Sequence, residues 1–497
     1  MKLAQLLSLF PQLKWGDAAN LEAVEVTQDS RAVKAGTVFV AIRGGSGDGH
    51  AHLAAAVRQG AVALVVEDET GIPADYTGAL VKVPSTRQAL DLIAQRFFGE
   101  PAKQLFCVGV TGTNGKTTIT YMLEAIFTKF GWPTGVMGTI DHHLKDKKWP
   151  SALTTPDPLT LQRRLKQFVA LGAQAAAFEV SSHALMQHRA DSLPFAVGIF
   201  TNFTRDHLDY HGTMENYFAA KERLFSELLG RHPGVNVAVL NADDPAVRQV
   251  RVGEGVMTWW YGGGVDHPAD FSFRPLKQDM NGTLFHLVTP RGNTEIHLPC
   301  TGLHNVYNAV AATAAALAAG VSLATVQEAL AQFRGAPGRL ERVNNSRGLH
   351  IFVDYAHTDD ALATVLKALT QVRTQAAHAG KIITVFGCGG DRDRGKRPLM
   401  AKAAASYSDA LVITSDNPRT ENPDAIIEQI KSGVPSDWTG ELTVEPDRRK
   451  ALSVALQMSA EGDVILIAGK GHEDYQIIGD KKLSFSDINV VTELLNE

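Results

Sequence analysis

The glycine-rich run at residues 112–118, Gly-Thr-Asn-Gly-Lys-Thr-Thr, has the residue types of a phosphate-binding loop. Glycines let backbone N–H groups approach phosphate oxygens closely, and the N-terminus of a following helix favours negative charge. The Lys116 amine would reach the β- and γ-phosphates, and the Thr117 hydroxyl would bind Mg²⁺. The first glycine of the usual pattern would fall at Val110, so the motif is a variant. It predicts a nucleotide site; the alternative is a tight strand–helix turn with a surface lysine.

Three further residues are candidates to complete a metal site beside such a loop. Glu179 ends an apolar run, where a carboxylate without a cation is energetically costly. A structural ion pair is the alternative for it. His207 lies in the run 206–212, Asp-His-Leu-Asp-Tyr-His-Gly, although a single histidine there is compatible with a structural role. Lys221, taken on the residues alone, is typical of a solvated helix lysine.

Short apolar runs alternate with helical patterns along the chain, which is typical of an α/β protein. A predicted strand at 105–110 precedes the glycine-rich loop, and a helix with 3.6-residue periodicity follows it as far as Gly131. Ligands of open α/β sheets bind beyond the carboxyl ends of the strands. Polar residues follow most of the other predicted strands of the central and C-terminal blocks, so both blocks are expected to hold ligands there. These strands are 175–180, 197–201, 235–240, 351–354, 382–386, 410–414 and 464–468.

The chain of 497 residues is long enough for about three domains. Glycine and proline cluster at residues 99–101 and again at 334–339, as is typical of connecting segments. These positions predict three blocks, residues 1–99, 100–335 and 336–497. The first block has predicted strands at 37–42, 61–66 and 80–83, and then a helix capped by Ser85.

Composition excludes several classes of protein. Hydrophobic residues make up 44% and charged residues 20%, and the net charge is −5, so the chain is globular without bulk attraction for nucleic acid or anionic membranes. Three widely spaced cysteines indicate neither a disulfide framework nor a zinc knuckle. Residues 1–10 predict a short amphipathic helix rather than a signal peptide, and the apolar tract 308–321 is too short to span a bilayer. We therefore expect a cytoplasmic protein with no membrane insertion.

Many motifs occur in the order found in one family: the chain resembles the Mur ligases, ATP-dependent amide ligases of peptidoglycan precursor synthesis. The resemblance covers essentially the full length. It is carried by the runs 112–118, 179–183, 201–202, 206–212, 241–244, 304–305 with 308, 338–341 and 354–357. It implies an α/β fold of three domains. These are an N-terminal UDP-substrate-binding domain (1–99), a central ATP-binding P-loop domain with a parallel sheet (100–335) and a C-terminal Rossmann-like domain that binds the amino acid (336–497).

The runs 387–393, 416–419 and 469–473 are most similar to those of family members that add a diamino acid. The form Asp-Asn-Pro-Arg at 416–419 resembles enzymes that use meso-2,6-diaminopimelate, because lysine-adding relatives lack the arginine. The resemblance implies an ADP-forming acid–amino-acid ligase. It would join meso-diaminopimelate to the D-Glu γ-carboxylate of UDP-MurNAc-L-Ala-D-Glu through an acyl phosphate.

The resemblance also assigns expected roles by position. The catalytic and metal-binding residues would be Lys116, Thr117, Glu179, His207 and Lys221, with Lys221 N-carboxylated to a metal-bridging carbamate. The ATP-binding residues would be Gly112, Thr113, Asn114, Gly115, Lys116, Thr117, Thr118, Asn308, Arg339, Asp354 and His357. The UDP-substrate residues would be Ser30, Gly45, Ser46, Gly47, Thr154, Thr155, Ser181, Gln187 and Arg189. The diaminopimelate residues would be Arg392, Asp416, Asn417, Pro418, Arg419, Gly469 and Glu473.

Two positions depart from the family pattern. Leu153 stands where the family usually has asparagine, and Asp359 stands where it has proline. The expected cofactors are Mg²⁺ and the CO₂-derived carbamate on Lys221, ATP is a co-substrate, and a monomer acting on small molecules is expected. The alternatives are the L-lysine-adding form of the ligase, a ligase like folylpolyglutamate synthetase, and a P-loop switch ATPase. A ligase like folylpolyglutamate synthetase should lack the N-terminal block, and a switch ATPase needs no amino-acid pocket.

Overall fold

The structure, a computed structural model, describes residues 1–16, 18, 20–44, 47–263, 268–375 and 380–497; the expected substrate residues Gly45 and Ser46 lie outside this set. The chain forms two compact units that alternate along the sequence. The first comprises Met1–Lys116, Phe127–Trp260 and Ala314–Val321, and the second comprises Thr117–Ile126, Tyr261–Thr313 and Ser322–Glu497.

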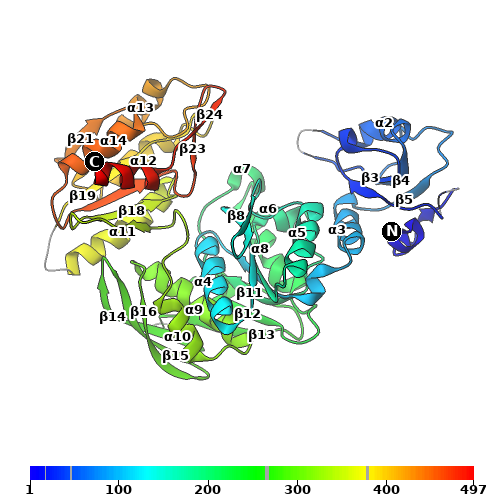
Figure 1. Cartoon of the computed structure of the whole chain (residues 1–497), viewed down its shortest axis with the longest axis horizontal. Helices are drawn as coiled ribbons and strands as arrows, with labels where there is room; N and C mark the ends of the chain where they lie inside the picture. The colour runs from blue at the N-terminus through cyan, green and yellow to red at the C-terminus, as the bar shows by residue number, and fades with distance from the viewer. Residues whose placement is uncertain (17, 19, 45–46, 264–267, 376–379) are drawn as a thin grey trace. The chain divides into compact units, whose positions relative to one another are not determined.

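The first unit begins with a five-stranded sheet (Figure 1). Its order is β1 (Leu13–Lys14), β5 (Ala79–Lys82), β4 (Ala61–Val66), β3 (Thr37–Val40) and β2 (Glu25–Thr27), and only β1 is antiparallel. The helices of this part are α1 (Leu3–Leu7), α2 (Leu53–Arg58) and α3 (Thr86–Phe97). Leucines on one side of α1 are buried, which confirms the predicted amphipathic helix. The Ser85 hydroxyl accepts a hydrogen bond from the Gln88 backbone, which confirms the predicted cap of α3.

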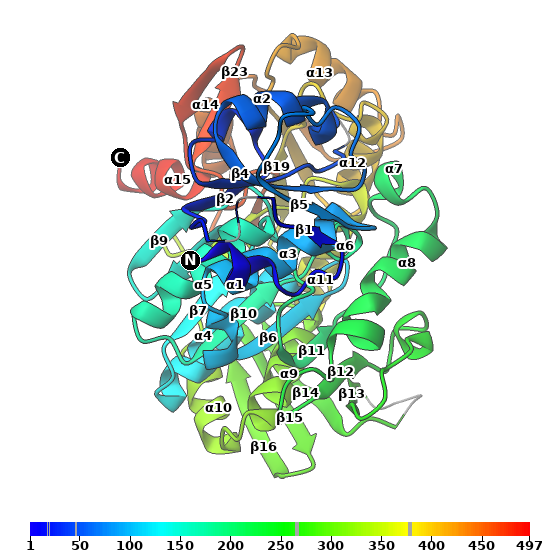
Figure 2. The same ribbon diagram turned by 90° about the vertical axis from the view of Figure 1, so that its right-hand side faces the viewer.

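The first unit also contains the sheet that carries the glycine-rich loop. Figure 2 shows its strands side by side. The order is β12 (Val237–Asn241), β11 (Phe195–Phe200), β6 (Phe106–Thr111), β10 (Ala175–Glu179), β7 (Thr134–Met137), β8 (Asp141–Leu144) and β9 (Lys147–Pro150). The first five are parallel, and β8 and β9 are antiparallel. The predicted strands are confirmed to within two residues. Since β6 lies between β10 and β11, the residues that follow these three strands meet at one edge.

Five helices follow the strands of this sheet or lie between them in the chain. They are α4 (Lys116–Phe130), α5 (Pro158–Ala170), α6 (Ser182–Met186), α7 (Leu208–His211) and α8 (Met214–Arg223). Gly131 ends α4 with φ +95°, as its sequence position predicts. A π-helical turn, Leu224–Leu228, continues α8. Buried side chains of this turn and of α5 join the phenylalanines of β10 and β11 in one core. This packing fixes the strand ends that carry the loop.

The second unit holds an antiparallel meander of β14 (Phe271–Asp279), β15 (Gly282–Thr289) and β16 (Gly292–Leu298). Strand β13 (Met257–Gly262) runs from the first unit into the second, where Tyr261 pairs with Phe271. The alanine-rich α9 (Leu303–Ala318) and α10 (Leu323–Ala331) follow. None of the strands predicted from the sequence corresponds to this meander.

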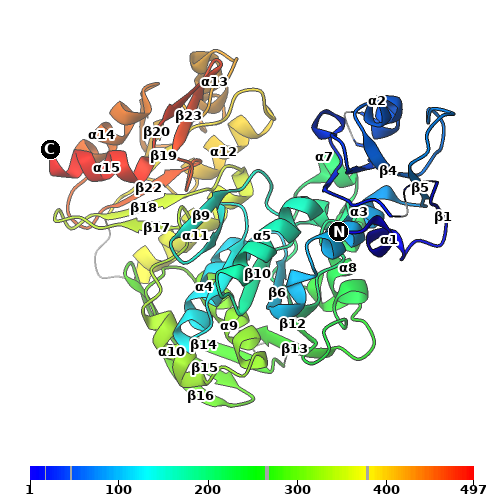
Figure 3. The same cartoon turned by 45° about the vertical axis from the view of Figure 1, so that its right-hand side comes forward.

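The C-terminal sheet of the second unit has six strands. The order is β17 (Glu341–Val343), β18 (His350–Asp354), β22 (Val464–Ala468), β19 (Ile382–Phe386), β20 (Ala410–Ile413) and β21 (Glu441–Val444), with β17 alone antiparallel. Helices α11 (Asp359–Gln375), α12 (Lys396–Ala405) and α13 (Pro423–Lys431) pack on one face, and α14 (Arg448–Met458) and α15 (Asp487–Asn496) on the other (Figure 3). A hairpin of β23 (Tyr475–Ile478) and β24 (Lys481–Ser484) lies beyond β22 in the chain.

Within the described ranges, no helix is long and apolar enough to cross a membrane.

Candidate functional site

The glycine-rich loop connects β6 to α4 at the edge where β6, β10 and β11 end. Gly112 has φ +135°, and a Cβ there would lie 1.9 Å from the Thr201 hydroxyl oxygen, so only glycine fits. Two residues after β11 hold the loop. The Thr201 hydroxyl donates to the Asn114 carbonyl at 2.6 Å, and the Asn202 side-chain oxygen accepts from the Asn114 N–H at 2.9 Å. The strand–loop–helix context that the phosphate-loop prediction requires is therefore confirmed.

Two lysine amines converge on one carbonyl of this loop. Lys116 Nζ donates to the Gly112 carbonyl at 3.0 Å and to the Thr113 carbonyl at 2.8 Å. Lys221 Nζ donates to the same Gly112 carbonyl at 2.7 Å. Burial, followed by the nearby Lys116 charge, holds the pKa of Lys221 well below its usual range. The Lys221 amine is thus biased toward its neutral, nucleophilic form.

Lys221 is 1% exposed, so the interpretation of it as a solvated lysine, taken on the residues alone, is wrong. Its Nζ lies 4.6 Å from the centre of the Tyr217 ring, one turn earlier on α8. The sequence held a signal for this. Four buried residues recur here at intervals of three and four positions: Tyr217, Lys221, Leu224 and Leu228. A lysine within an apolar stripe is therefore expected to point inward.

Glu179, at the end of β10, is 1% exposed and is held in a fixed orientation. Its carboxylate accepts from the Thr139 N–H at 2.8 Å and from the Thr139 hydroxyl at 3.1 Å. A Cβ at Gly138 would lie 2.2 Å from the carboxylate, so the backbone approaches it closely. Thr139 was not predicted as a site residue. Its position just after β7, which neighbours β10, is the feature that could have indicated it.

His207 has φ +52° and stands at the start of α7 among other aromatic rings. The centroid of its ring lies 4.9 Å from that of His183. Partial burial lowers the pKa of His207, the Asp206 carboxylate opposes this, and the charges of Lys116 and Lys221 lower it further. A neutral imidazole is the form that binds a metal ion. Among the residues that the structure describes, no group of three or more His, Cys, Asp and Glu side chains could hold a metal ion by itself.

Several of the expected UDP-substrate residues are joined by hydrogen bonds near Glu179. The Thr155 hydroxyl donates to the Glu179 carbonyl at 2.7 Å and accepts from the Ser181 N–H at 3.0 Å. The Arg189 guanidinium donates to the Thr155 carbonyl at 3.0 Å and to the Gln187 side chain at 3.1 Å.

Other expected UDP-substrate positions are less enclosed or lie elsewhere in the chain. Thr154 contacts the Thr139 hydroxyl at 3.1 Å. Leu153, one of the two departures, is 46% exposed. Ser30 begins a 3₁₀ helix, Ser30–Ala32, that follows β2, and Gly47 lies between β3 and β4.

The expected ATP residues of the second unit lie on α9, just before β17, and at or just after the end of β18. Asn308 is buried on α9 and donates to the Asn305 side chain at 3.3 Å. The Arg339 guanidinium lies 4.9 Å from the centre of the Tyr355 ring. Both Asp354 oxygens accept from backbone N–H groups, at 2.7 and 2.8 Å, so this carboxylate stabilises the turn. His357 is exposed.

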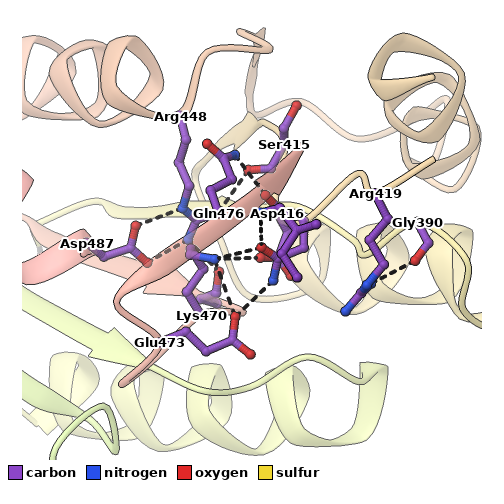
Figure 4. Close-up of polar contacts among 12 residues, drawn as sticks. Gly390, Ser415, Asp416, Arg419, Arg448, Lys470, Glu473, Gln476 and Asp487 are labelled. Atoms are coloured by element: carbon purple, nitrogen blue, oxygen red, sulfur yellow. Dashed lines mark hydrogen bonds and ion pairs between the residues drawn. The ribbon is translucent and has the colours of Figure 1, made fainter. Parts of the chain in front are cut away.

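The expected acceptor residues gather beyond the C-terminal sheet, where β19, β20 and β22 end (Figure 4). Arg419 has φ +49°, and its guanidinium donates to the Gly390 carbonyl at 2.7 Å. A Cβ at Gly389 would lie 2.9 Å from this guanidinium and 3.6 Å from Arg392 Cγ, so both arginine side chains pass close to Gly389. The backbone of Arg419 also bonds to Ile477 of β23.

A fully buried lysine supports the same loops. Lys470 Nζ lies 3.3 Å from Asp416 Oδ1, 3.3 Å from Asn417 Oδ1 and 3.4 Å from Glu473 Oε2. The Asn417 amide also donates to Glu473 at 2.9 Å. Lys470 was not predicted as a site residue. Its place in the run Gly-Lys-Gly directly after β22 is a sequence signal that could have indicated it.

Three family descriptions match: "Mur ligase family, catalytic domain" at residues 23–98, "Mur ligase middle domain" at 110–316 and "Mur ligase, glutamate ligase domain" at 338–471. A UDP-N-acetylmuramoyl-L-alanyl-D-glutamate--2,6-diaminopimelate ligase of Geobacillus thermodenitrificans is 42% identical over 100% of both chains. One of Geobacter metallireducens is 42% identical over 100% of this chain and 99% of its own. A solved structure of a ligase of that name is 33% identical, has a TM-score of 0.73 and covers 100% of this chain and 99% of its own.

Proposed function

Because the chain belongs to the Mur ligase family, we propose that it is an ATP-dependent ligase that joins meso-2,6-diaminopimelate to UDP-MurNAc-L-Ala-D-Glu. The new amide would form at the D-Glu γ-carboxylate, in peptidoglycan precursor synthesis. The observation that carries this proposal is the full-length likeness to ligases of that name at 42% identity. The Arg419 guanidinium beside Gly389 adds a chemical reason, since guanidinium groups bind carboxylates bidentately.

The reaction needs an activated carboxylate, because amide formation from a free carboxylate is uphill in water. The γ-carboxylate attacks the γ-phosphorus of ATP, the bond to the β-phosphate oxygen breaks, and an acyl phosphate and ADP result. The amine of the acceptor then attacks the acyl carbon, phosphate leaves, and the amine loses a proton. The protein mainly positions reactants and offsets their charge repulsion. We assign this work to Lys116 and to the loop N–H groups, Gly112 to Thr118.

The metal site would use Thr117, Glu179, His207 and a carboxylated Lys221. The residues fit such a role. Glu179 is buried and oriented, and the pKa values of His207 and Lys221 are both lowered. When bound, Mg²⁺ would offset the repulsion between carboxylate and triphosphate. The neutral Lys221 nitrogen can add to the carbon of CO₂ and release a proton, giving a carbamate anion in place of an amine. With that anion, a second carboxylate-like ligand would join Glu179.

The remaining assignments are proposals of the same kind. Asn308, Arg339, Asp354 and His357 would complete the ATP site. The UDP-dipeptide would bind at residues 30, 45–47, 154–155, 181, 187 and 189. The acceptor would bind at 392, 416–419, 469 and 473. We further propose three domains, residues 1–99, 100–335 and 336–497, in a cytoplasmic monomer.

Steady-state assays with ATP, UDP-MurNAc-L-Ala-D-Glu and either diamino acid test the proposed function. We expect ADP and phosphate only when both co-substrates are present, with meso-diaminopimelate strongly preferred over L-lysine. AMP and pyrophosphate as products would refute the acyl-phosphate route. A preference for L-lysine would refute the acceptor assignment. ATP hydrolysis that is independent of any amino acid would favour a switch ATPase.

A further inference from the structure

The strongest unassigned feature is the buried amine of Lys470. It is 0% exposed, and burial of a cation is costly unless charged or polar partners compensate it. An ammonium has three N–H bonds, and three side-chain oxygens lie at 3.3 to 3.4 Å from this one. Its donors are therefore all engaged by the protein. Lys470 cannot donate to a substrate without giving up one of these partners, so we treat it as a positioning residue.

The partners of Lys470 belong to two loops that follow non-neighbouring strands and are also joined directly, by the Asn417–Glu473 hydrogen bond. Asp416 and Asn417 follow β20, and Glu473 follows β22, whereas β19 lies between these two strands. The loop after β19 contains Gly389, around which Arg392 and Arg419 lie. Lys470 therefore joins the loops on either side of the expected acceptor site (Figure 4).

A second buried cation shows what a purely structural role looks like in the same place. Arg448 pairs with Asp487 at 2.7 Å and donates to the carbonyls of Ser415 and Ala468. These partners are backbone groups near the ends of β20 and β22 and a carboxylate of α15. Lys470, in contrast, contacts the side chains expected to meet the acceptor. The position of the loops is thus held by Arg448, and the orientation of their functional groups is held by Lys470.

The charges at this position bear on acceptor choice. Asp416 and Glu473 each carry a negative charge and Lys470 carries one positive charge, so together they present one net negative charge. Two uncompensated carboxylates would strongly attract a terminal ammonium. L-Lysine ends in such an ammonium without a carboxylate, whereas meso-diaminopimelate ends in both. An internal cation lowers the attraction for the terminal ammonium of either acceptor, so the second carboxylate, which only meso-diaminopimelate offers to Arg419, becomes the group that decides between them.

We propose that Lys470 is a positioning residue that selects the acceptor. It orients Asp416, Asn417 and Glu473 around the acceptor site and offsets the negative charge that would attract a competing ammonium. This inference rests on the proposed function, because it concerns the choice between diamino acids by that same site.

The test compares Lys470→Met, Lys470→Arg and the control Lys482→Met in steady-state kinetics with both diamino acids. Methionine keeps much of the lysine volume without its charge. Lys482 is a suitable control because its Nζ lies 3.9 Å from the Tyr475 ring, which Lys470 also approaches at 5.6 Å, but its side chain faces solvent. Thermal unfolding of each variant checks that it is folded.

For Lys470→Met we expect at least a roughly tenfold rise in the KM for meso-diaminopimelate, because a buried charge pair loses one partner. The ratio of kcat/KM between the two diamino acids should fall by about tenfold or more for the same reason. The KM values for ATP and the UDP-dipeptide should not change. Lys470→Arg should retain most of the selectivity, and Lys482→Met all of it.

A merely structural role would lower stability and the active fraction while leaving the KM and the selectivity ratio as in the wild type, and that result would overturn the inference. If Lys470→Met does not fold, Lys470→Gln decides, because it also removes the positive charge but keeps a side chain that can donate hydrogen bonds. A rise confined to the KM for meso-diaminopimelate supports the inference, and equal or absent changes in all three KM values overturn it. A wild type that does not use meso-diaminopimelate would instead refute the proposed function itself.

Discussion

Replacing Arg419 by glycine should separate its chemical role from its structural one. Arg419 has φ +49°, a backbone conformation that costs a residue with a side chain about 1–2 kcal/mol. Glycine relieves this strain but loses about 0.5–1 kcal/mol more conformational entropy on folding. The substitution also removes the hydrogen bond to the Gly390 carbonyl, worth about 1 kcal/mol. These contributions nearly cancel, so the free energy of unfolding should change by less than about 1 kcal/mol.

Catalysis should respond quite differently to Arg419→Gly. Loss of one partner of a buried charge pair costs about 2–5 kcal/mol, which is roughly 30-fold or more in affinity. The KM for meso-diaminopimelate should therefore rise at least tenfold, with little change in the KM for ATP or for the UDP-dipeptide. Arg419→Ala is the matched control. It loses the same guanidinium but keeps the strained backbone, so it should share the kinetic defect and be less stable than the glycine variant.

Denaturant unfolding and steady-state kinetics of the two variants decide the matter. An unchanged KM for meso-diaminopimelate in both variants would refute the role of Arg419 in acceptor binding. A loss of more than about 3 kcal/mol in Arg419→Gly, beyond the range of an ordinary hydrogen bond, would show instead that the arginine holds the loop together.

Three further outcomes are expected. Lys116→Ala should lower kcat by about 10²–10³, since a charge contact to the transferred phosphoryl group is lost; a loss below tenfold in a turnover assay would mean that Lys116 is structural. Lys221→Ala should be nearly inactive and partly rescued by added short carboxylic acids, which would replace the carbamate; full activity without them would contradict its role. Burial raises the pKa of Asp91 to about 8, above its unfolded value of about 3.9. The folded state then binds more protons, so the free energy of unfolding should fall as pH rises from about 4 to 8, by up to about 5 kcal/mol. Asp91→Asn should flatten that slope in urea titrations, and an unchanged slope would argue against this assignment.

Most of the parallel strands could be predicted because their sequences are short, continuous apolar runs. Strands β4, β19 and β22 have the predicted bounds, since strands buried on both faces are almost entirely apolar; Thr384 of β19 is the one polar residue in these three strands. The meander β14–β16 was missed because its strands are partly exposed and mix polar with apolar residues. Periodicity gives a weaker signal in such strands.

The parts of the candidate site that lie close together in the sequence could be predicted, and the contacts between distant residues could not. The phosphate loop is contiguous, so the residues alone indicated it. Glu179 was a candidate from its strand end, but its partner Thr139 lies 40 residues earlier. Lys470 is separated from Asp416 by 54 residues. Contacts of this kind depend on strand order, which local sequence patterns do not contain.

The close approach of Gly112 to Thr201 limits how this loop can vary. Any side chain at 112 would meet the Thr201 hydroxyl, which itself holds the Asn114 carbonyl at 2.6 Å. Serine at 201 keeps the obstructing oxygen. Alanine at 201 removes that oxygen but loses the bond, and the Cβ of residue 201 and the Asn202 nitrogen would still lie 3.0 and 3.1 Å from a Cβ at 112. Neither of these small replacements at 201 therefore rescues a substitution at 112. A mutational path that alters this glycine must pass through an intermediate with a disrupted loop, so libraries of variants of the glycine-rich loop should vary other positions.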